Sequence, residues 1–358
     1  MTLSATACSN DFNGATTGDP QSPVAHPLAG LAEVERLTHP SGAELVVASH
    51  GGAVLRWRAP WRRPDGTIGV EDLVDGFADA HELATYDASR SALMAPFVNR
   101  LAGGAYVFDG VAHAMAPVVA GEPVPMHGFV RALDWVVVSR TEAARAEDES
   151  VVVLGTRVGT EDVAGYPFAV AFEVEYGIGP AGLRVELRAT NTGQQDAPVA
   201  LGWHPYLRVP GHARIDSLEL SVPAARAVVT DPGLVPLPGA AAFAEIDGVG
   251  PLVLAGARLD HAFAGLRPDV DGRARTVVRD PRTGRGLALW QRGGLVHVYT
   301  GDGLARRGRA ALAVEPVSTL TNAFNRADCE PDVRLAPGET RRFEAGVELL
   351  GQQVGDPA

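Results

Sequence analysis

Two residues of this chain, His204 and Glu315, are candidates for general acid–base chemistry. Each is a titratable residue that directly follows an apolar run. His204 comes directly after the apolar segment 199–203, and Pro205 then removes a backbone donor that strand pairing would need. Glu315 closes the apolar run 311–314. A carboxylate in such surroundings is costly unless it is paired or functional, and desolvation raises its pKa toward the range of a useful base. Histidine titrates near neutrality unaided.

Each of these residues also has a structural interpretation. His204 is compatible with an aromatic corner of the core, and Glu315 with a surface glutamate at a strand end. Trp203 and Tyr206 flank the histidine, and a pyranose ring has an apolar C–H face that stacks on aromatic side chains. A sugar is therefore the candidate ligand of this segment.

Three further segments carry polar residues beside turn residues. Asn99 and Arg100 precede a Gly-Gly turn, and a guanidinium offers five fixed donors for hydroxyls or a carboxylate. His127 stands before Gly128 near a strand start, and Asp260 has oxygens for two sugar hydroxyls. The alternatives are an arginine that caps loop carbonyls, a packed histidine and an Asx-turn aspartate.

The elements that must position these residues are predicted to be strands. Leu183, Val185 and Leu187 alternate with charged residues, which is typical of a half-buried strand. The same pattern predicts strands at residues 135–138, 151–154, 168–176, 199–203, 218–222, 276–279, 287–291, 295–300 and 342–349. Helical periodicity is confined to short candidates at 79–83 and 305–309. Many short strands with frequent Gly and Pro turns predict an all-β fold, a large antiparallel β-sandwich.

Nothing in the 358 residues separates two domains. The most linker-like stretches, 141–149 and 231–242, are short and lie between predicted strands. We expect one sandwich domain over residues 28–352, a flexible N-terminal tail at 1–27 that is rich in Ser, Thr, Asn, Gly and Pro, and a short C-terminal tail at 353–358.

The composition of the chain limits the kinds of binding partner that we expect for it. The net charge is −12 and no block of basic residues is present, so a nucleic acid is not an expected partner. Cys8 and Cys329 are too few for a disulfide framework or a zinc quartet. No apolar run reaches the roughly 18 residues of a membrane span, and the N-terminus lacks the pattern of a signal peptide, so a cytoplasmic protein without a membrane partner is expected.

Taken together, the polar segments resemble the aldose 1-epimerase (galactose mutarotase) family. The ordered matches cover roughly residues 40–350 and are Asn99-Arg100, His127-Gly128, Gly165–Phe168, His204–Tyr206, Leu259-Asp260, and Glu315-Pro316 with Asn322-Ala-Phe324. The resemblance implies a galactose mutarotase-like supersandwich with an open sugar cleft. It also implies His204 as general acid to the ring oxygen, Glu315 as base to the C1 hydroxyl, and His127 as a second active-site histidine. Arg100 and Asp260 would bind hydroxyls.

Two departures leave the sugar open. The Asn-Arg loop resembles a bacterial branch of uncertain sugar preference, because Ala105 stands near a position where galactose-type members carry a further arginine. The segment at Thr321–Phe324 also differs from the family's more usual Pro-Pro-Asp stretch.

The expected reaction is interconversion of the α and β anomers of a free aldohexose by acid–base ring opening and reclosure. This chemistry needs no metal or cofactor, and no Gly-rich phosphate loop appears. Three alternatives remain: a hexose-6-phosphate 1-epimerase that uses cations among Arg131, Arg208 and Arg306–Arg309, a non-catalytic sugar-binding protein on the same scaffold, and a glycoside hydrolase with Glu315 and Asp260 as its carboxylates. The partner would be a small-molecule sugar, and the protein a monomer or homodimer.

Overall fold

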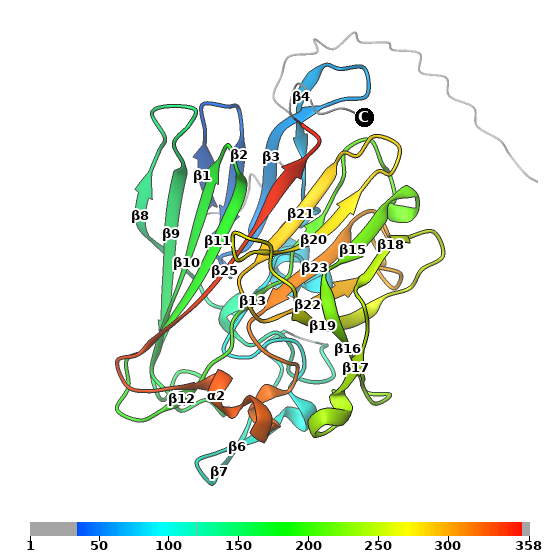
Figure 1. Ribbon diagram of the computed structural model, residues 1–358. Helices are drawn as coiled ribbons and strands as arrows, with labels where there is room; N and C mark the ends of the chain where they lie inside the picture. The colour runs from blue at the N-terminus through cyan, green and yellow to red at the C-terminus, as the bar shows by residue number, and fades with distance from the viewer. Residues whose placement is uncertain (1–33, 120, 353–358) are drawn as a thin grey trace, which may run out of the picture.

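Two large antiparallel sheets form the body of the molecule, and the all-β sandwich predicted from the strand pattern is confirmed. The computed structural model describes residues 34–119 and 121–352. Both predicted tails, residues 1–27 and 353–358, lie outside the described residues, as does Cys8. Figure 1 shows the larger sheet crossing the front of the molecule, with strands of the second sheet behind it.

The first sheet has nine strands, and its central strands alternate buried apolar with partly exposed charged residues. Leu183, Val185 and Leu187 are buried, whereas Arg184 and Arg188 face outward, as a period of two requires. In spatial order the strands are β18 (Val249–Val253), β15 (Glu219–Val222), β20 (Ala274–Arg279), β21 (Gly286–Gln291), β25 (Thr340–Leu350), β11 (Gly182–Asn191), β10 (Val170–Gly179), β9 (Ser150–Val158) and β8 (Val136–Thr141).

The second sheet has eight strands, and its central strand, β23, is buried along its whole length. Its order is β17 (Phe243–Glu245), β16 (Ala224–Val228), β19 (Asp260–Leu266), β22 (Leu295–Tyr299), β23 (Leu312–Val317), β13 (Gly202–Trp203) and β5 (Leu93–Met94), with β14 (Tyr206–Leu207) also paired to β23.

Smaller elements surround the two large sheets. A four-stranded sheet contains β1 (Val34–Thr38), β2 (Glu44–Ala48), β3 (Val54–Arg62) and β4 (Ile68–Asp72). Two-stranded pairs join β6 (Ala105–Phe108) to β7 (Val111–Ala114) and β12 (Ala197–Pro198) to β24 (Arg334–Leu335). The α-helices are α1 (Ala80–Thr85) and α2 (Glu330–Val333). Turns of 3-10 helix lie at 87–89, 102–104, 130–132, 215–217, 239–242, 323–325 and 327–329.

The helix predicted at 79–83 is confirmed as α1, which begins after Asp79. The Asp79 side chain caps this helix by accepting a hydrogen bond from the backbone N–H of Glu82. The helix predicted at 305–309 is wrong. That segment is a run of turns in which Arg307 and Arg309 have left-handed backbone conformations, which are incompatible with a continuous helix.

Two strand predictions also need correction. The segment 199–203 is not one strand, because the N–H of Val199 bonds to the carbonyl of Val333 and that of Ala200 to the carbonyl of Pro96. Only Gly202 and Trp203 join the eight-stranded sheet. Glu315 does not close its strand, since β23 continues through Pro316 to Val317.

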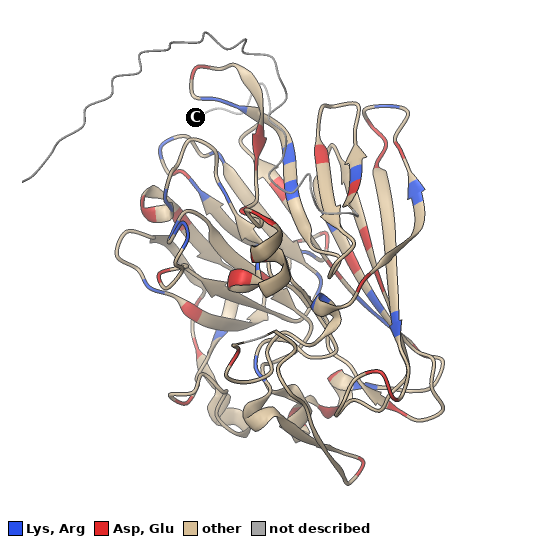
Figure 2. Ribbon diagram, turned by 180° about the vertical axis from the view of Figure 1, so that it is seen from behind, with Lys and Arg blue, Asp and Glu red and all other residues tan. Residues whose placement is uncertain are grey.

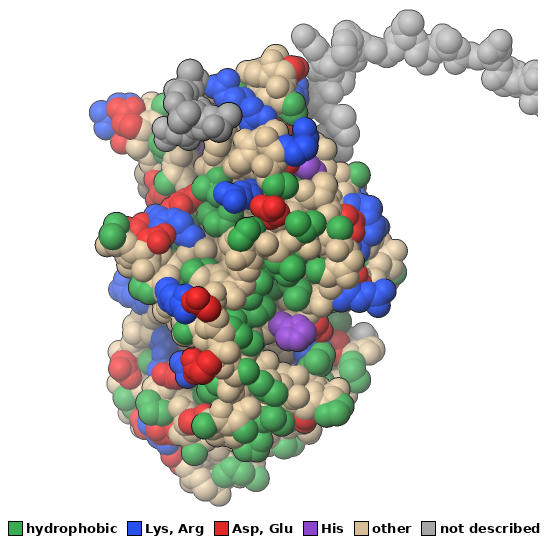
Figure 3. All heavy atoms as spheres, turned by 45° about the vertical axis from the view of Figure 1, so that its right-hand side comes forward, with side chains coloured by type: hydrophobic (Ala, Val, Ile, Leu, Met, Phe, Trp, Pro, Cys, Tyr) green, Lys and Arg blue, Asp and Glu red, His purple; other side chains and the backbone are tan. Residues whose placement is uncertain are grey.

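The main hydrophobic core extends from Leu37 to Val347 along the chain and contains buried side chains from both large sheets. Acidic and basic residues are interspersed along the ribbon in Figure 2, and the face drawn in Figure 3 shows no continuous basic patch. Among residues 34–119 and 121–352, no helix has the length and apolar character that crossing a membrane requires.

The loop before Phe129 is tied closely to β5, and this contact depends on a glycine. Gly128 has a φ of +69° and forms a bridge to Ala95. The N–H of Phe129 donates to the Ala95 carbonyl at 2.9 Å. A Cβ on Gly128 would lie 1.8 Å from that same carbonyl oxygen, so only glycine fits.

We therefore expect Gly128→Ala to destabilise the protein more than a matched glycine substitution. The control is Gly103→Ala, because Gly103 has a φ of +65° but no atom within 4 Å of the place that a Cβ would occupy. Both variants incur the cost of a left-handed alanine, about 1–2 kcal/mol. Gly128→Ala should cost about 1–3 kcal/mol beyond its control through steric overlap. Urea unfolding measures both, and equal losses would contradict this account of the loop.

Candidate active site

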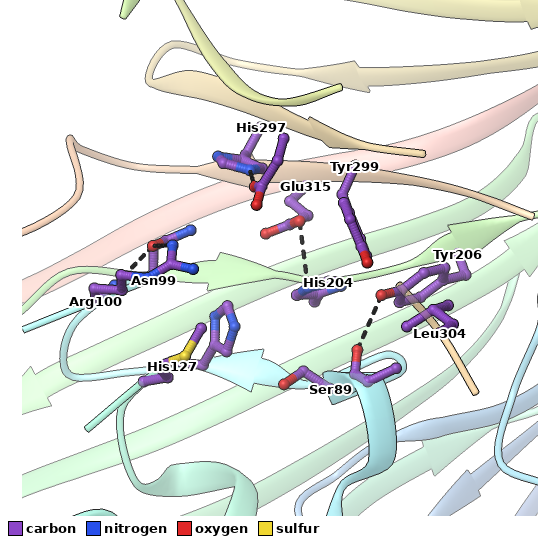
Figure 4. Close-up of a pocket in the computed structure, with 13 residues that line it drawn as sticks. Ser89, Asn99, Arg100, His127, His204, Tyr206, His297, Tyr299, Leu304 and Glu315 are labelled. Atoms are coloured by element: carbon purple, nitrogen blue, oxygen red, sulfur yellow. Dashed lines mark hydrogen bonds and ion pairs between the residues drawn. The ribbon is translucent and has the colours of Figure 1, made fainter. Parts of the chain in front are cut away.

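A cavity of about 280 Å³ lies against one face of the eight-stranded sheet. Most of its polar side chains come from consecutive strands of this sheet and from the loops around β5 (Figure 4). The lining residues are Ala88, Ser89, Asn99, Arg100, Met126, His127, His204, Tyr206, Asp260, His297, Tyr299, Leu304 and Glu315.

Strand register places Glu315 between two histidines. On one side of β23, Glu315 lies directly opposite His297 of β22. On the other side, Gly202 lies opposite Val317 and Tyr206 opposite Ala313. His204 lies midway between Gly202 and Tyr206, and Glu315 lies midway between Val317 and Ala313, so His204 lies opposite Glu315. Directly opposed residues of antiparallel strands point to the same face, so the three side chains form a row that faces the cavity.

His204 and Glu315 are in direct contact within this row. Nε2 of His204 lies 3.2 Å from Oε1 of Glu315, and both side chains are more than nine-tenths buried. The backbone of His204 is held on both sides, since its N–H donates to Ala92 and its carbonyl accepts from Ser91. The other carboxylate oxygen of Glu315 is buried and has no hydrogen-bond partner among the described residues. Its capacity to accept a hydrogen bond is therefore unused in this structure.

Burial shifts the pKa values of this pair in opposite directions. It raises the pKa of Glu315 to about 7, and nearby Asp260 acts in the same direction, while His297 and Arg100 oppose it. Burial lowers the pKa of His204 to about 3, and the charge of His297 contributes to that decrease. At neutral pH, His204 is accordingly a neutral imidazole beside a carboxyl group that is poised to ionise.

His297 forms a second pair, with Asp260. Its Nε2 lies 2.7 Å from Oδ1 of Asp260, which begins the neighbouring strand β19. Burial alone would lower the pKa of His297, but the negative charges of Glu315 and Asp260 outweigh it and the pKa is raised. The hydrogen bond from His297 lowers the pKa of Asp260. One oxygen of Asp260 is thus already engaged within the protein.

His127 and Arg100 approach from the loops around β5. The ring of His127 meets that of His204 edge to face, with centroids 5.1 Å apart, and its Nδ1 lies 2.9 Å from Sδ of Met94. Burial, followed by the charges of surrounding cations, holds its pKa well below the usual value. Asn99 has a left-handed backbone, and its side-chain oxygen accepts from both the backbone and the guanidinium of Arg100. Asn99 therefore orients Arg100.

The segment at Asn322 braces this same loop. The N–H of Asn322 donates to the carbonyl of Arg100, and its side-chain oxygen accepts from the N–H of Ala102. The Asn-Ala-Phe stretch at residues 322–324 thus supports the position of Arg100 without lining the cavity itself.

The cavity contains all but one of the residues predicted for a site. His204, Glu315, His127, Arg100, Asn99, Asp260 and Tyr206 line it, and Tyr206 stacks on His204 with ring centroids 5.2 Å apart. The prediction for Trp203 is wrong. Trp203 directly precedes His204 in the chain, and adjacent residues of an extended strand point to opposite faces. The side chain of Trp203 therefore points away from the cavity and is fully buried in the core. It offers no surface to a sugar.

Six lining residues were not predicted as site residues: Ala88, Ser89, Met126, His297, Tyr299 and Leu304. His297 and Tyr299 alternate along the apolar strand β22, so a period-two pattern places both on one face. The prediction rested on polar residues at strand ends, and a histidine inside a strand falls outside that pattern. Leu304 directly precedes the turn segment 305–309 that was predicted to be a helix, and no local pattern marks it or Ser89.

Most arginines proposed as phosphate ligands are engaged elsewhere. Arg131 pairs with Glu122, and Arg306 with Glu82. Arg307 pairs with Asp75 at 2.9 Å, and Arg309 with Asp216 and Asp302. Neither these arginines nor Arg208 lines the cavity, to which Arg100 alone contributes a guanidinium among the described residues. No group of three or more His, Cys, Asp or Glu in the described part of the chain is arranged to hold a metal ion.

Comparison with known proteins agrees with this fold. A family model described as aldose 1-epimerase matches residues 33–348. The uncharacterized protein YihR of Escherichia coli is 26% identical over 239 residues, which are 65% of this chain and 71% of that protein. Galactose mutarotase of Sus scrofa is 28% identical over 169 residues, 47% of this chain and 46% of that protein. The crystal structure of a GalM/aldose epimerase homologue from C. elegans superposes with a TM-score of 0.72 at 21% identity, covering 88% of this chain and 98% of that one.

From the burial of Glu315 we predict how the stability of the folded chain depends on pH. A carboxyl with a pKa of about 7 in the folded chain and 4.5 in the unfolded chain binds more protons when folded, so its contribution to stability falls as pH rises between those values. Glu315→Gln removes this dependence. Relative to wild type, the variant should gain up to about 3 kcal/mol between pH 4.5 and pH 8.

Urea unfolding at several pH values measures this difference. The control is Glu147→Gln, since Glu147 is largely exposed and should leave the pH dependence of stability unchanged. A constant difference between Glu315→Gln and wild type across pH 4.5–8 would show that the carboxyl of Glu315 titrates normally.

Proposed function

This chain belongs to the aldose 1-epimerase family, and from that premise we propose that it interconverts the α and β anomers of a free aldose, with His204 and Glu315 as its acid–base pair. The single observation that carries the proposal is the contact between Nε2 of His204 and Oε1 of Glu315 in an open cavity. A hemiacetal needs one proton removed and one supplied at neighbouring oxygens, which two adjacent groups of this kind provide.

The proposed reaction begins with loss of the C1 hydroxyl proton to the ionised carboxylate of Glu315. As the bond from C1 to the ring oxygen breaks, His204 donates a proton to that oxygen, and an open-chain aldehyde with a free hydroxyl results. Rotation about C1–C2 presents the other face of the carbonyl. The hydroxyl then attacks C1, returning its proton to His204, while Glu315 returns a proton to the former carbonyl oxygen. No proton is gained or lost over the cycle.

The neutral state of His204 is compatible with this role. A neutral imidazole can act as an electrophile and proton donor at an oxygen that becomes strongly basic during the reaction. In the free protein, Nε2 of His204 lies 3.2 Å from Oε1 of Glu315, and a bound ring oxygen would take the place of that carboxylate oxygen opposite Nε2. The edge of His127 contacts the ring of His204 and helps to fix its orientation.

The remaining lining groups fit a sugar. Arg100, held by Asn99, presents donors for hydroxyl oxygens, and the oxygen of Asp260 that His297 does not engage can accept from a hydroxyl. Tyr206 keeps its ring against His204 and donates its hydroxyl to the carbonyl of Ala88. In this proposal, the main role of Tyr206 is to hold the ring of His204, the general acid, in place. Stacking of Tyr206 on the sugar is a smaller role.

The alternatives receive less support from the cavity. A 6-phosphate needs cations, but Arg131, Arg306, Arg307 and Arg309 pair with carboxylates outside the cavity, and Arg208 does not line it. A glycoside hydrolase needs two carboxyl groups free to act on the scissile bond, whereas Asp260 is hydrogen-bonded to His297. A purely sugar-binding protein has no need for a carboxyl whose pKa is raised to about 7 beside a neutral histidine.

Substitution of either member of the acid–base pair should remove most of the activity. We expect His204→Asn and Glu315→Gln each to lower kcat by about 10²–10⁴-fold, because each removes one proton-transfer group. Polarimetry of freshly dissolved α-D-glucose and α-D-galactose measures the rate. The matched control is His212→Asn, since His212 also faces a carboxylate, Asp280, but lies outside the cavity. Mutarotation at the wild-type rate in His204→Asn or Glu315→Gln would contradict the assigned roles.

Free sugars should be better substrates than their 6-phosphates. With Arg100 as the one guanidinium that the described residues bring to the cavity, we expect kcat/KM for at least one free aldohexose to exceed that for its 6-phosphate by about tenfold or more. NMR of anomer exchange at equilibrium allows both classes to be compared in the same way. A higher kcat/KM for the phosphate would favour the hexose-6-phosphate 1-epimerase instead.

A further inference from the structure

The pair of Asp260 and His297 has no assigned role in the proton transfers described above, although it adjoins the base. We infer that His297, oriented by Asp260, is a positioning residue that favours the ionised form of the Glu315 carboxyl at neutral pH. This inference rests on the proposed function, because it concerns the base of that reaction.

The first argument is the location of His297 relative to Glu315. The two residues are direct partners in the ladder between β22 and β23. Side chains of directly opposed residues have Cβ atoms about 4.5–5.5 Å apart and lie on the same face. A positive imidazolium at this position therefore acts on the Glu315 carboxylate across a short, largely buried distance, where solvent screens it weakly.

The second argument is the hydrogen bond that holds His297. Nε2 donates to Oδ1 of Asp260 at 2.7 Å, which fixes the ring and favours its protonated form. The raised pKa of His297 and the lowered pKa of Asp260 agree with an ion pair at neutral pH. Nδ1 has no hydrogen-bond partner among the described residues, so the ring is tethered at one nitrogen only.

The third argument concerns the other charges around Glu315. The loop after β5 contributes Arg100, β19 contributes Asp260, the connection from β13 to β14 contributes His204, and β14 contributes Tyr206. His127 faces His204 from its own loop, and burial holds its pKa well below the usual value. Arg100 and His297 are thus the two cations that oppose the effect of burial on Glu315, and His297 is the one that is adjacent in the sheet.

Loss of this cation should change the pH dependence of catalysis. In His297→Gln the glutamine amide can still donate to Asp260, but the positive charge is gone. Burial and Asp260 then raise the pKa of Glu315 further, so the base is protonated at neutral pH. At a pH below that pKa, the ionised fraction of the carboxyl falls about tenfold for each further pH unit. Activity should therefore be lost at low pH and recovered at high pH.

The experiment records kcat/KM from pH 5 to pH 10 for wild type, His297→Gln and the control His212→Gln. We expect the low-pH midpoint of His297→Gln to lie at least one pH unit above that of wild type, with a loss of about eightfold or more at pH 6.5 and less than a threefold loss at pH 9. His212→Gln should follow the wild-type profile, because its carboxylate partner lies outside the cavity. An equal loss at all pH values would overturn the inference, since a merely structural or substrate-binding role acts in that way.

A readout that does not need turnover separates this inference from the proposed function. The ¹³C resonance of the Glu315 carboxyl, assigned by its absence in Glu315→Gln, should titrate at least one pH unit higher in His297→Gln than in wild type. An unchanged midpoint overturns the inference even if the wild type is an active mutarotase. A raised midpoint in a protein without mutarotase activity supports the influence of His297 while contradicting the proposed function.

The wild-type protein provides a test that does not depend on folding of the variant. In ¹⁵N spectra, the ring nitrogens of His297 should show a protonated imidazole at pH 7, and Asp260→Asn should lower the pH at which that proton is lost. A neutral His297 ring at pH 6 in the wild-type protein would overturn the inference.

Discussion

The register of β23 with its two neighbours is the constraint on which the site depends. Glu315 meets His297 across one ladder and His204 across the other, so a single alignment of three strand segments creates the whole row. A slip of one residue would turn Glu315 toward the opposite face. The strand is buried along its length, and its apolar residues hold the register through core packing. The energy that stabilises the sandwich therefore also aligns the reacting groups.

Burial then gives these groups their chemical character. The same desolvation raises the pKa of Glu315 and lowers that of His204, because one group is anionic and the other cationic when charged. His297 is also buried, but its pKa is raised, because Asp260 and Glu315 are its neighbours. The pKa values of the three side chains in one row are thus shifted differently because their partners differ, and His297 is hydrogen-bonded to the carboxylate of Asp260.

Much of the fold could be predicted from the sequence, and the site only in part. Apolar and charged residues alternate at Leu183–Leu187, and such a pattern predicts a strand without knowledge of distant residues, because a period of two is a local property of the sequence. The broken segment around His204 and the turns at 305–309 depend on distant partners, such as Val333, Pro96 and the carboxylates that bind Arg307 and Arg309. Trp203 was expected in the site although adjacent residues of a strand face opposite ways, and His297 was not, because its importance comes from its neighbour across the ladder.

Some residues that line the cavity lie on the sheet and others on loops, and this has a consequence for how such a protein can change in evolution. The reacting row lies on strands whose register the core holds, whereas Ser89, Arg100 and Leu304 lie on connecting segments. The turn that carries Leu304 is attached through ion pairs of Arg306, Arg307 and Arg309, and Arg100 is held by Asn99 and Asn322. Exchange of these loops would alter one part of the cavity wall and leave the row of His204, Glu315 and His297 in place. Under the proposed function, one scaffold can in this way diversify its choice of sugar through evolution while its chemistry stays constant.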